Sequence, residues 1–184
     1  MWTGDRWTHA FWLGPATLGL CAVRAVEADP DPVDPARVIS PVYQEVEFER
    51  GVDRMGALLL GQAGPHHFSA VFAVWEGPSE DGIEVDVADR CRYGPAVLGC
   101  TYEIEPDAGL LADAGPARVA WDVAGGRLAL EAREPDRLTL AEAGARAYRV
   151  QVLAAVDPAS HTQRCAYRWR WTPVTPPTEM TNGT

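Results

Sequence analysis

Arginine and aromatic residues that alternate near the C-terminus are the first candidates for ligand chemistry. The segment RCAYRWRWTPV, residues 164–174, places Trp169 between Arg168 and Arg170, and Arg149 lies in the preceding apolar segment. Guanidinium groups hold carboxylates and phosphates in a two-pronged geometry. Together with Trp169, these three arginines would form a binding face for a small anionic ligand.

The same alternation is typical of an ordinary strand with one buried face and one wet face. We expect the segment to pair with AYRVQV, residues 147–152, with the aromatic side chains inward and the arginines outward. Like charges on neighbouring strands repel, so acidic residues such as Glu131 or Glu45 should lie beside the arginines. This interpretation is preferred, because charged residues on the outer face of a strand are usually solvated. A third possibility, with tryptophans outward and stacked on a sugar, reverses the parity and would bury guanidinium groups at high cost.

Cysteines supply a second set of candidates. Cys91 and Cys100 flank the loop RYGPAVLG, which a disulfide could close if the protein is exported. Cys91, Cys100 and Cys165 together with His161 also amount to four soft metal ligands. Their spacing differs from the tight Cys-x2-Cys pattern of most zinc sites, so the metal site is the weaker alternative.

Signatures of catalysis are otherwise missing from the sequence. All 16 basic residues are arginine, which excludes a P-loop lysine, a Schiff base and a Ser–Lys pair. No nucleophile elbow, HExxH metal motif or glycine-rich nucleotide loop is present. The adjacent His66 and His67 would point to opposite faces of a strand and so could not easily share one metal. We therefore favour a non-catalytic protein over an enzyme and expect no cofactor.

Length and charge limit the remaining classes of function. The chain has 184 residues, which suggests one domain with a substantial core. Its formal net charge is −10 and its pI is about 4.8. An acidic field repels phosphate backbones, so nucleic acid is not an expected partner. The lack of lysine, beside abundant alanine, valine, proline and glycine, indicates a GC-rich bacterial genome.

The N-terminal segment allows two interpretations. Residues 10–23 form the longest apolar run, which is shorter than the roughly 20 residues of a transmembrane helix but long enough for the core of a signal peptide. Residues 1–28 are therefore either a signal peptide or an N-terminal arm packed on the domain. Secretion or the cell envelope is thus about as favoured as the cytoplasm. A proline-rich linker follows over residues 29–37, and residues 175–184 are expected to form a flexible tail.

Hydrophobic residues alternate with a period of two through residues 38–174, in about nine short segments separated by turn residues. This pattern predicts an all-β domain, an antiparallel β-sandwich of immunoglobulin-like type. A closed β-barrel is the alternative. In the barrel, Trp121, Trp169, Phe68 and Phe72 would line a ligand cavity.

One segment resembles a known family of domains. LTLAEAGARAYRVQVLAAV, residues 138–156, is similar to the E–F corner and F strand of fibronectin type III and immunoglobulin-like domains. The resemblance implies a sandwich in which a tyrosine hydroxyl returns to the backbone at the corner. It implies a fold and no function. The matching residues are Leu138, Leu140, Tyr148, Val150 and Val152.

These observations favour a non-catalytic binding or interaction module, exported or envelope-associated, in a GC-rich bacterium. Its partner would be a protein or a small anionic ligand. The alternatives are a ligand-holding β-barrel, a small metalloprotein or enzyme that uses the cysteines and His161, and a structural subunit of a larger assembly.

Overall fold

The described part of the chain folds entirely from β-strands. It contains 16 strands and no helix, so the expected all-β class is confirmed. No helix in this part could therefore cross a membrane. The proline-rich segment before residue 36 and the tail after residue 174 lie outside the described residues. The computed structural model describes residues 2–4, 6–12, 21–26, 36–51, 55–106, 110–123, 125–143 and 147–174.

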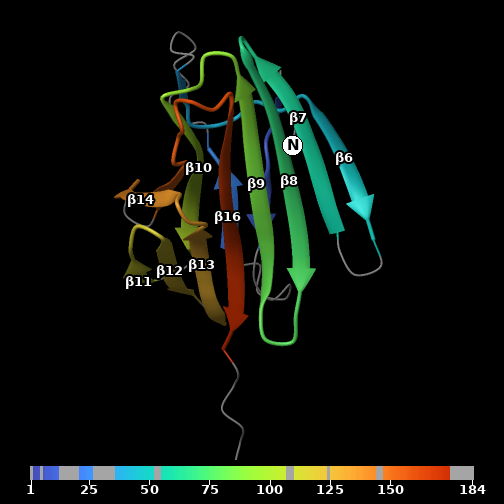
Figure 1. Cartoon of the computed structure of the whole chain (residues 1–184). Coiled ribbons are helices and arrows are strands. Elements are labelled where there is room, and N and C mark those ends of the chain that lie inside the picture. The colour runs from blue at the N-terminus through green and yellow to red at the C-terminus, as the bar shows by residue number, and fades with distance from the viewer. Residues whose placement is uncertain are drawn as a thin grey trace, which may run out of the picture.

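The larger sheet has eight strands, and all of its neighbouring pairs are antiparallel. Its longest strands lie in the middle and face the viewer in Figure 1. In spatial order they are β11 (Leu110–Ala114), β12 (Arg118–Val123), β13 (Gly126–Ala132), β16 (Thr162–Pro173), β9 (Asp81–Cys91), β8 (His66–Glu76), β7 (Met55–Ala63) and β6 (Glu45–Arg50).

The smaller sheet is built around β10 and lies behind the larger one in Figure 1. The short β5 (Arg37–Val38) is the only strand of this sheet that pairs in parallel with its neighbour, β10, among the described residues. A separate ribbon is made of β1 (Trp2–Thr3) and β2 (Arg6–Trp7). The main strands of the smaller sheet, in spatial order, are β14 (Arg137–Glu142), β15 (Tyr148–Leu153), β10 (Val97–Pro106), β4 (Cys21–Ala25) and β3 (Ala10–Trp12).

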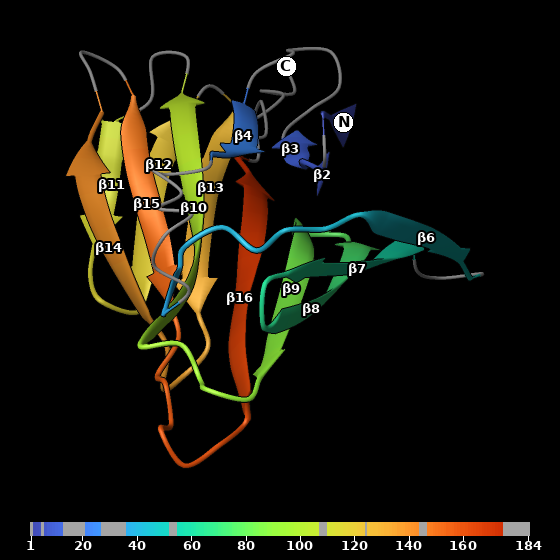
Figure 2. The same cartoon turned by 90° about the horizontal axis from the view of Figure 1, so that it is seen from above.

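The two sheets pack face to face as a β-sandwich and do not close into a barrel, so the barrel alternative is wrong (Figure 2). The four residues expected to line a barrel cavity, Trp121, Trp169, Phe68 and Phe72, lie within the packed core. Trp121 and Trp169 are completely buried. Indole and phenyl groups therefore fill the space between the sheets, as in an ordinary protein interior.

The alternation of residue types decides which face of each strand is buried. In β9, Ile83, Val85 and Val87 point into the core, and in β10 Tyr102 and Ile104 do the same. The hairpin between β12 and β13 pairs apolar residues of this face, with Trp121 opposite Leu128 and Val119 opposite Leu130. Its turn is tight enough to place Gly125 at φ 86°, a conformation that side chains with a Cβ rarely adopt.

Two expectations about neighbouring strands are wrong. The segment AYRVQV forms β15, which pairs with β10 and β14 in the smaller sheet, whereas RCAYRWRWTPV lies in β16 of the larger sheet. The E–F corner implied by the family resemblance would carry the chain from one sheet to the other. Instead β14 and β15 form a hairpin within one sheet, with Leu138 opposite Val152 and Leu140 opposite Val150.

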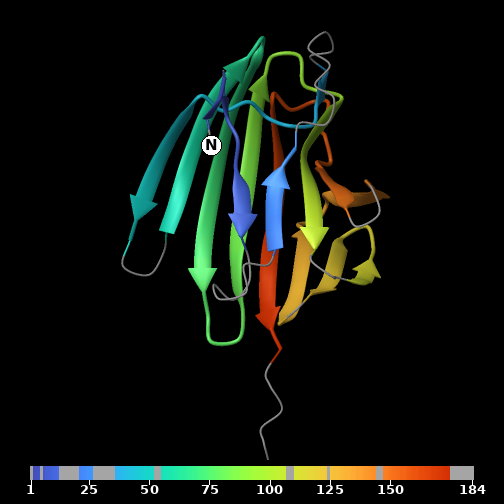
Figure 3. The same ribbon diagram turned by 180° about the vertical axis from the view of Figure 1, so that it is seen from behind.

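Residues from the N-terminal segment form part of the sandwich. Strands β3 and β4 lie beside β10 and extend the smaller sheet (Figure 3). Phe11 of β3 is buried in the core, with its ring 5.7 Å from that of Phe72. Trp7 joins Tyr43 through a hydrogen bond from its backbone N–H to the carbonyl oxygen, at 2.7 Å. The described residues of this segment, 6–12 and 21–26, therefore lie against the sandwich.

Replacing Phe11 with alanine should lower the free energy of unfolding by about 3 kcal/mol, because it leaves a cavity in the core. Trp12, the next residue, is 69% exposed and supplies a matched control on the same strand. Trp12→Ala should change stability by less than about 0.5 kcal/mol. Urea unfolding of the two variants measures both effects, and equal small losses would show that the arm does not contribute to the core.

Candidate functional site

The arginines of β16 lie on the wet face of the larger sheet beside carboxylates, as expected. Arg168 Nε is 2.6 Å from Glu131 Oε2, and Arg170 Nη1 is 3.3 Å from Glu131 Oε1. Partial burial raises the pKa of Glu131, but the hydrogen bond from Arg168 and the nearby guanidinium charges outweigh burial and lower it. Glu45 does not take part, because β7, β8 and β9 separate its strand from β16. These arginines are engaged with carboxylates of the same sheet.

Arg149 lies in the smaller sheet, so the proposed cluster of Arg149, Arg168 and Arg170 is divided between two faces of the molecule. It lines a separate hollow of about 310 Å³ together with Arg37, Thr139 and Gln151. Its register partner on β10 is Glu103. The three arginines cannot act on one ligand, because the thickness of the sandwich separates them.

Trp169 is completely buried and cannot stack on a ligand at the surface. Its ring packs edge-to-face against Tyr102 of the opposite sheet, with centroids 5.3 Å apart. The hydroxyls of Tyr102 and Tyr167 are hydrogen-bonded to each other, and His9 Nε2 lies 3.0 Å from the Tyr102 hydroxyl. This chain of polar groups joins the arm and both sheets. It belongs to the core, beside a cavity of only about 30 Å³.

The cysteines do not form the expected groupings. Cys91, Cys100 and Cys165 are free and buried, so the Cys91–Cys100 disulfide is not formed in this structure. No three histidine, cysteine or acidic side chains within the described ranges could together hold a metal ion. Burial raises the pKa of the Cys100 thiol to about 12, although a hydrogen bond with Tyr167 acts to lower this pKa. Burial also raises the pKa of the Cys165 thiol. Thiols in this state are poor nucleophiles and poor metal ligands.

The adjacent histidines point to opposite faces, as expected. His66 is buried, and its Nδ1 lies 2.8 Å from Oδ2 of the buried Asp89. Burial raises the pKa of Asp89, although the hydrogen bond and charge of His66 oppose that rise. His67 is exposed on the outer face, opposite Arg90. One histidine thus supports the core at the end of β8 while the other faces solvent.

The exposed histidine opens onto a hollow at the loop end of the larger sheet, which we call the basic hollow. Its volume is about 480 Å³, within the usual range for small-molecule sites. Three separate chain segments meet there: the β7–β8 turn, the end of β9 with the loop after it, and the loop before β16. No carboxylate is among its lining residues, which are Pro65, His67, Arg90, Cys91, Arg92 and His161.

The guanidinium groups of the basic hollow differ from the others on this face. Arg118, Arg127, Arg164, Arg168 and Arg170 of the larger sheet all lie within ion-pair distance of an aspartate or glutamate. Arg90 and Arg92, in contrast, form no ion pair within the described part of the chain. Arg92 instead lies over the ring of Tyr93, with its guanidinium carbon 5.7 Å from the ring centroid.

Sequence analysis named two lining residues of the basic hollow, Cys91 and His161, but for metal binding. It missed Arg90, Arg92 and His67. Their signal was available in part, because RCR and HH occur at strand ends beside a turn or loop, where binding residues are often found. Only the strand order shows that these two segments lie beside the loop that contains His161.

Comparisons with known proteins add no family to these observations. No model of a protein family matches the chain, and no curated protein matches it.

Burial makes His9 a source of acid sensitivity. Its ring packs against Phe11, Phe72 and Tyr102, and this burial lowers the pKa of His9 from 6.5 to about 4. Below pH 6.5 His9 is protonated in the unfolded chain, whereas in the folded chain it stays neutral until about pH 4. The free energy of unfolding therefore falls as the pH drops through this window. The part due to His9 is roughly 2–3 kcal/mol at pH 4.

Urea unfolding across this pH window measures the effect. His9→Gln retains a hydrogen-bonding group for Tyr102 and should flatten this part of the pH dependence. The exposed His67 is the control, and His67→Gln should keep the wild-type profile. Identical profiles for wild type and His9→Gln would show that His9 does not stay neutral in the folded protein.

Proposed function

We propose that this protein is a non-catalytic binding module that holds an anionic group, a carboxylate or a phosphate, in the basic hollow. The observation that carries the proposal is the unpaired state of Arg90 and Arg92 within the described residues. Two guanidinium groups repel each other, and an oxyanion between them would relieve that repulsion. Such groups bind carboxylates and phosphates through short, charge-assisted hydrogen bonds.

The charge of the whole protein makes the basic hollow more distinctive. The chain carries a formal net charge of −10, so a region that combines two arginines and two histidines runs against the overall field. His67 and His161 would add ring N–H donors around the same volume. A rigid sheet positions Arg90 and His67 at facing register positions, which limits the entropy lost when a ligand binds.

The chemistry of the surroundings supports binding rather than catalysis. The Cys91 side chain that lines the basic hollow is buried, and the thiols of Cys100 and Cys165 have raised pKa values. The His66–Asp89 pair faces the core, on the opposite side of the strands from His67 and Arg90. The described residues thus present no activated nucleophile beside the two arginines.

Titration with inorganic phosphate and with citrate, followed by isothermal calorimetry, tests the proposal. Arg90→Gln and Arg92→Gln should each weaken binding by about tenfold or more, because a hydrogen bond to a charged group contributes about 1.5–3 kcal/mol. Binding should weaken as the salt concentration rises, because mobile ions screen exposed charges.

Two matched variants serve as controls. Arg127→Gln removes the same charge from a paired arginine on the same sheet, and Arg149→Gln removes one from the other hollow. Both should leave the affinity within about twofold of wild type, since neither side chain lines the basic hollow. A loss of affinity confined to Arg149→Gln would place the anion on the smaller sheet and contradict the proposal.

Export remains a separate part of the proposal, since it derives from the apolar N-terminal segment. Expression in a GC-rich bacterial host followed by intact-mass measurement tests it. Loss of about 28 residues is expected for an exported protein. A full-length intracellular chain would retain Phe11 in its core and would remove export from the proposal.

A further inference from the structure

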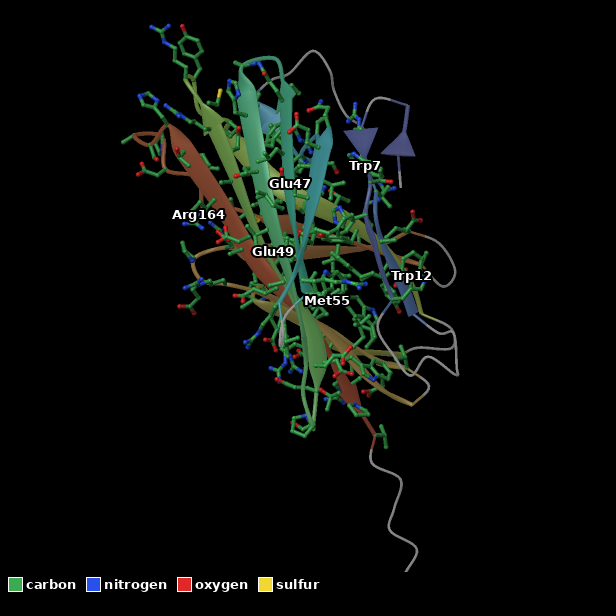
Figure 4. The ribbon with its side chains drawn as sticks, turned by 90° about the vertical axis from the view of Figure 1, so that its right-hand side faces the viewer. Trp7, Trp12, Glu47, Glu49, Met55 and Arg164 are labelled. Atoms are coloured by element: carbon green, nitrogen blue, oxygen red, sulfur yellow. The ribbon has the colours of Figure 1, made fainter. Side chains whose placement is uncertain are left out.

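The strand β6 forms one edge of the larger sheet. It pairs with β7, and no other described strand pairs with it. Alternate backbone N–H and C=O groups of such a strand point away from the sheet without a partner strand. Figure 4 looks at the molecule from the β6 side, where Glu47, Glu49 and Met55 are labelled.

A row of acidic side chains follows the outer face of β6. Glu45, Glu47 and Glu49 occupy alternate positions and are all exposed. None of them forms an ion pair with a described residue. Behind the row, on β7, are the apolar Leu58 and Leu60, each directly opposite one of the glutamates. Among the described residues, the row therefore has no cationic partner on the outer face of its sheet.

The other face of β6 carries Val46 and Phe48, with Arg50 at the end of the strand opposite Met55. Phe48 is 81% exposed, although it shares a face with Phe72 of the core. Met55 on β7 is 49% exposed on the same side. The reason is geometric, because β6 projects beyond β3, the last strand of the smaller sheet (Figure 2). Apolar groups are thus available on this face next to an unpaired edge.

A second copy of the same edge is a poor occupant. If two β6 strands paired antiparallel about a two-fold axis, the glutamate rows of both copies would lie on the same face of the joined sheet. Like charges on directly opposite positions are destabilising. Charged residues on an edge strand are a known defence against such self-association. The complementary occupant is basic.

From this complementarity we infer that β6 is a docking site for an extended segment of another protein with alternating basic and apolar residues. The segment adds as a ninth strand to the larger sheet. Its backbone completes the hydrogen bonds of β6, as in other cases of β-strand addition. Its lysine or arginine side chains face Glu45, Glu47 and Glu49, and its apolar side chains contact Phe48 and Met55. This site is independent of the basic hollow.

A synthetic peptide of nine residues that alternates lysine with valine provides the probe, with fluorescence anisotropy as the readout. We expect saturable binding to the full-length protein. The triple variant Glu45→Gln, Glu47→Gln, Glu49→Gln should weaken it by about tenfold, because three cross-strand ion pairs are lost. Methylation of alternate peptide amides on the side facing β6 should abolish binding, since those N–H groups can no longer donate.

The matched control removes three exposed glutamates elsewhere, through Glu76→Gln, Glu134→Gln and Glu142→Gln. It has the same net charge as the β6 triple variant and should bind the peptide within about twofold of wild type. Equal weakening in both triple variants would reduce the effect to general charge attraction and overturn the inference. Full binding by the methylated peptide would also overturn the inference. So would a dimer of the unliganded protein that the Phe48→Lys substitution dissociates, because a second copy would then occupy this edge.

Discussion

The contact between the inner faces of β16 and β10 is the constraint on which the rest of the structure depends. Trp169 and Tyr167 of one sheet meet Tyr102 of the other, all within the buried core. A shift of one residue in β16 would turn these aromatic rings outward and bring Arg168 and Arg170 inside. Burying two guanidinium groups is so unfavourable that only the aromatic face of β16 can point into the core.

Once that parity is set, the reactive side chains divide by location. The thiols of Cys100 and Cys165 and the hydroxyls of Tyr102 and Tyr167 lie between the sheets, where burial raises their pKa values and holds them protonated. The charged residues other than the buried Asp89 lie mainly on the outer faces, where most arginines of the larger sheet meet a carboxylate. Chemistry with an external ligand is thereby confined to rims and edges of the sandwich.

The unequal width of the two sheets creates those rims. Eight strands face a smaller sheet, and within the described residues Phe48 of β6 and Met55 of β7 stay exposed. At the loop end, by contrast, three connections converge beside the ends of β8 and β9 and enclose the basic hollow. The two regions carry opposite charge, acidic along β6 and basic in the hollow. One β-sandwich thus carries two surfaces of opposite charge, and these are the two regions proposed as binding surfaces.

The sequence by itself determined the strands and their faces, because side-chain alternation is a local property with a period of two. It therefore placed the aromatic residues of β16 in the core and Arg168 and Arg170 on the surface. Only the tertiary structure decided which strands are neighbours, because pairing depends on contacts between residues far apart in the chain. For this reason the alternation alone led to a wrong expectation, in which β15 and β16 pair in one sheet. For the same reason, only the fold shows the basic hollow, which three distant segments form.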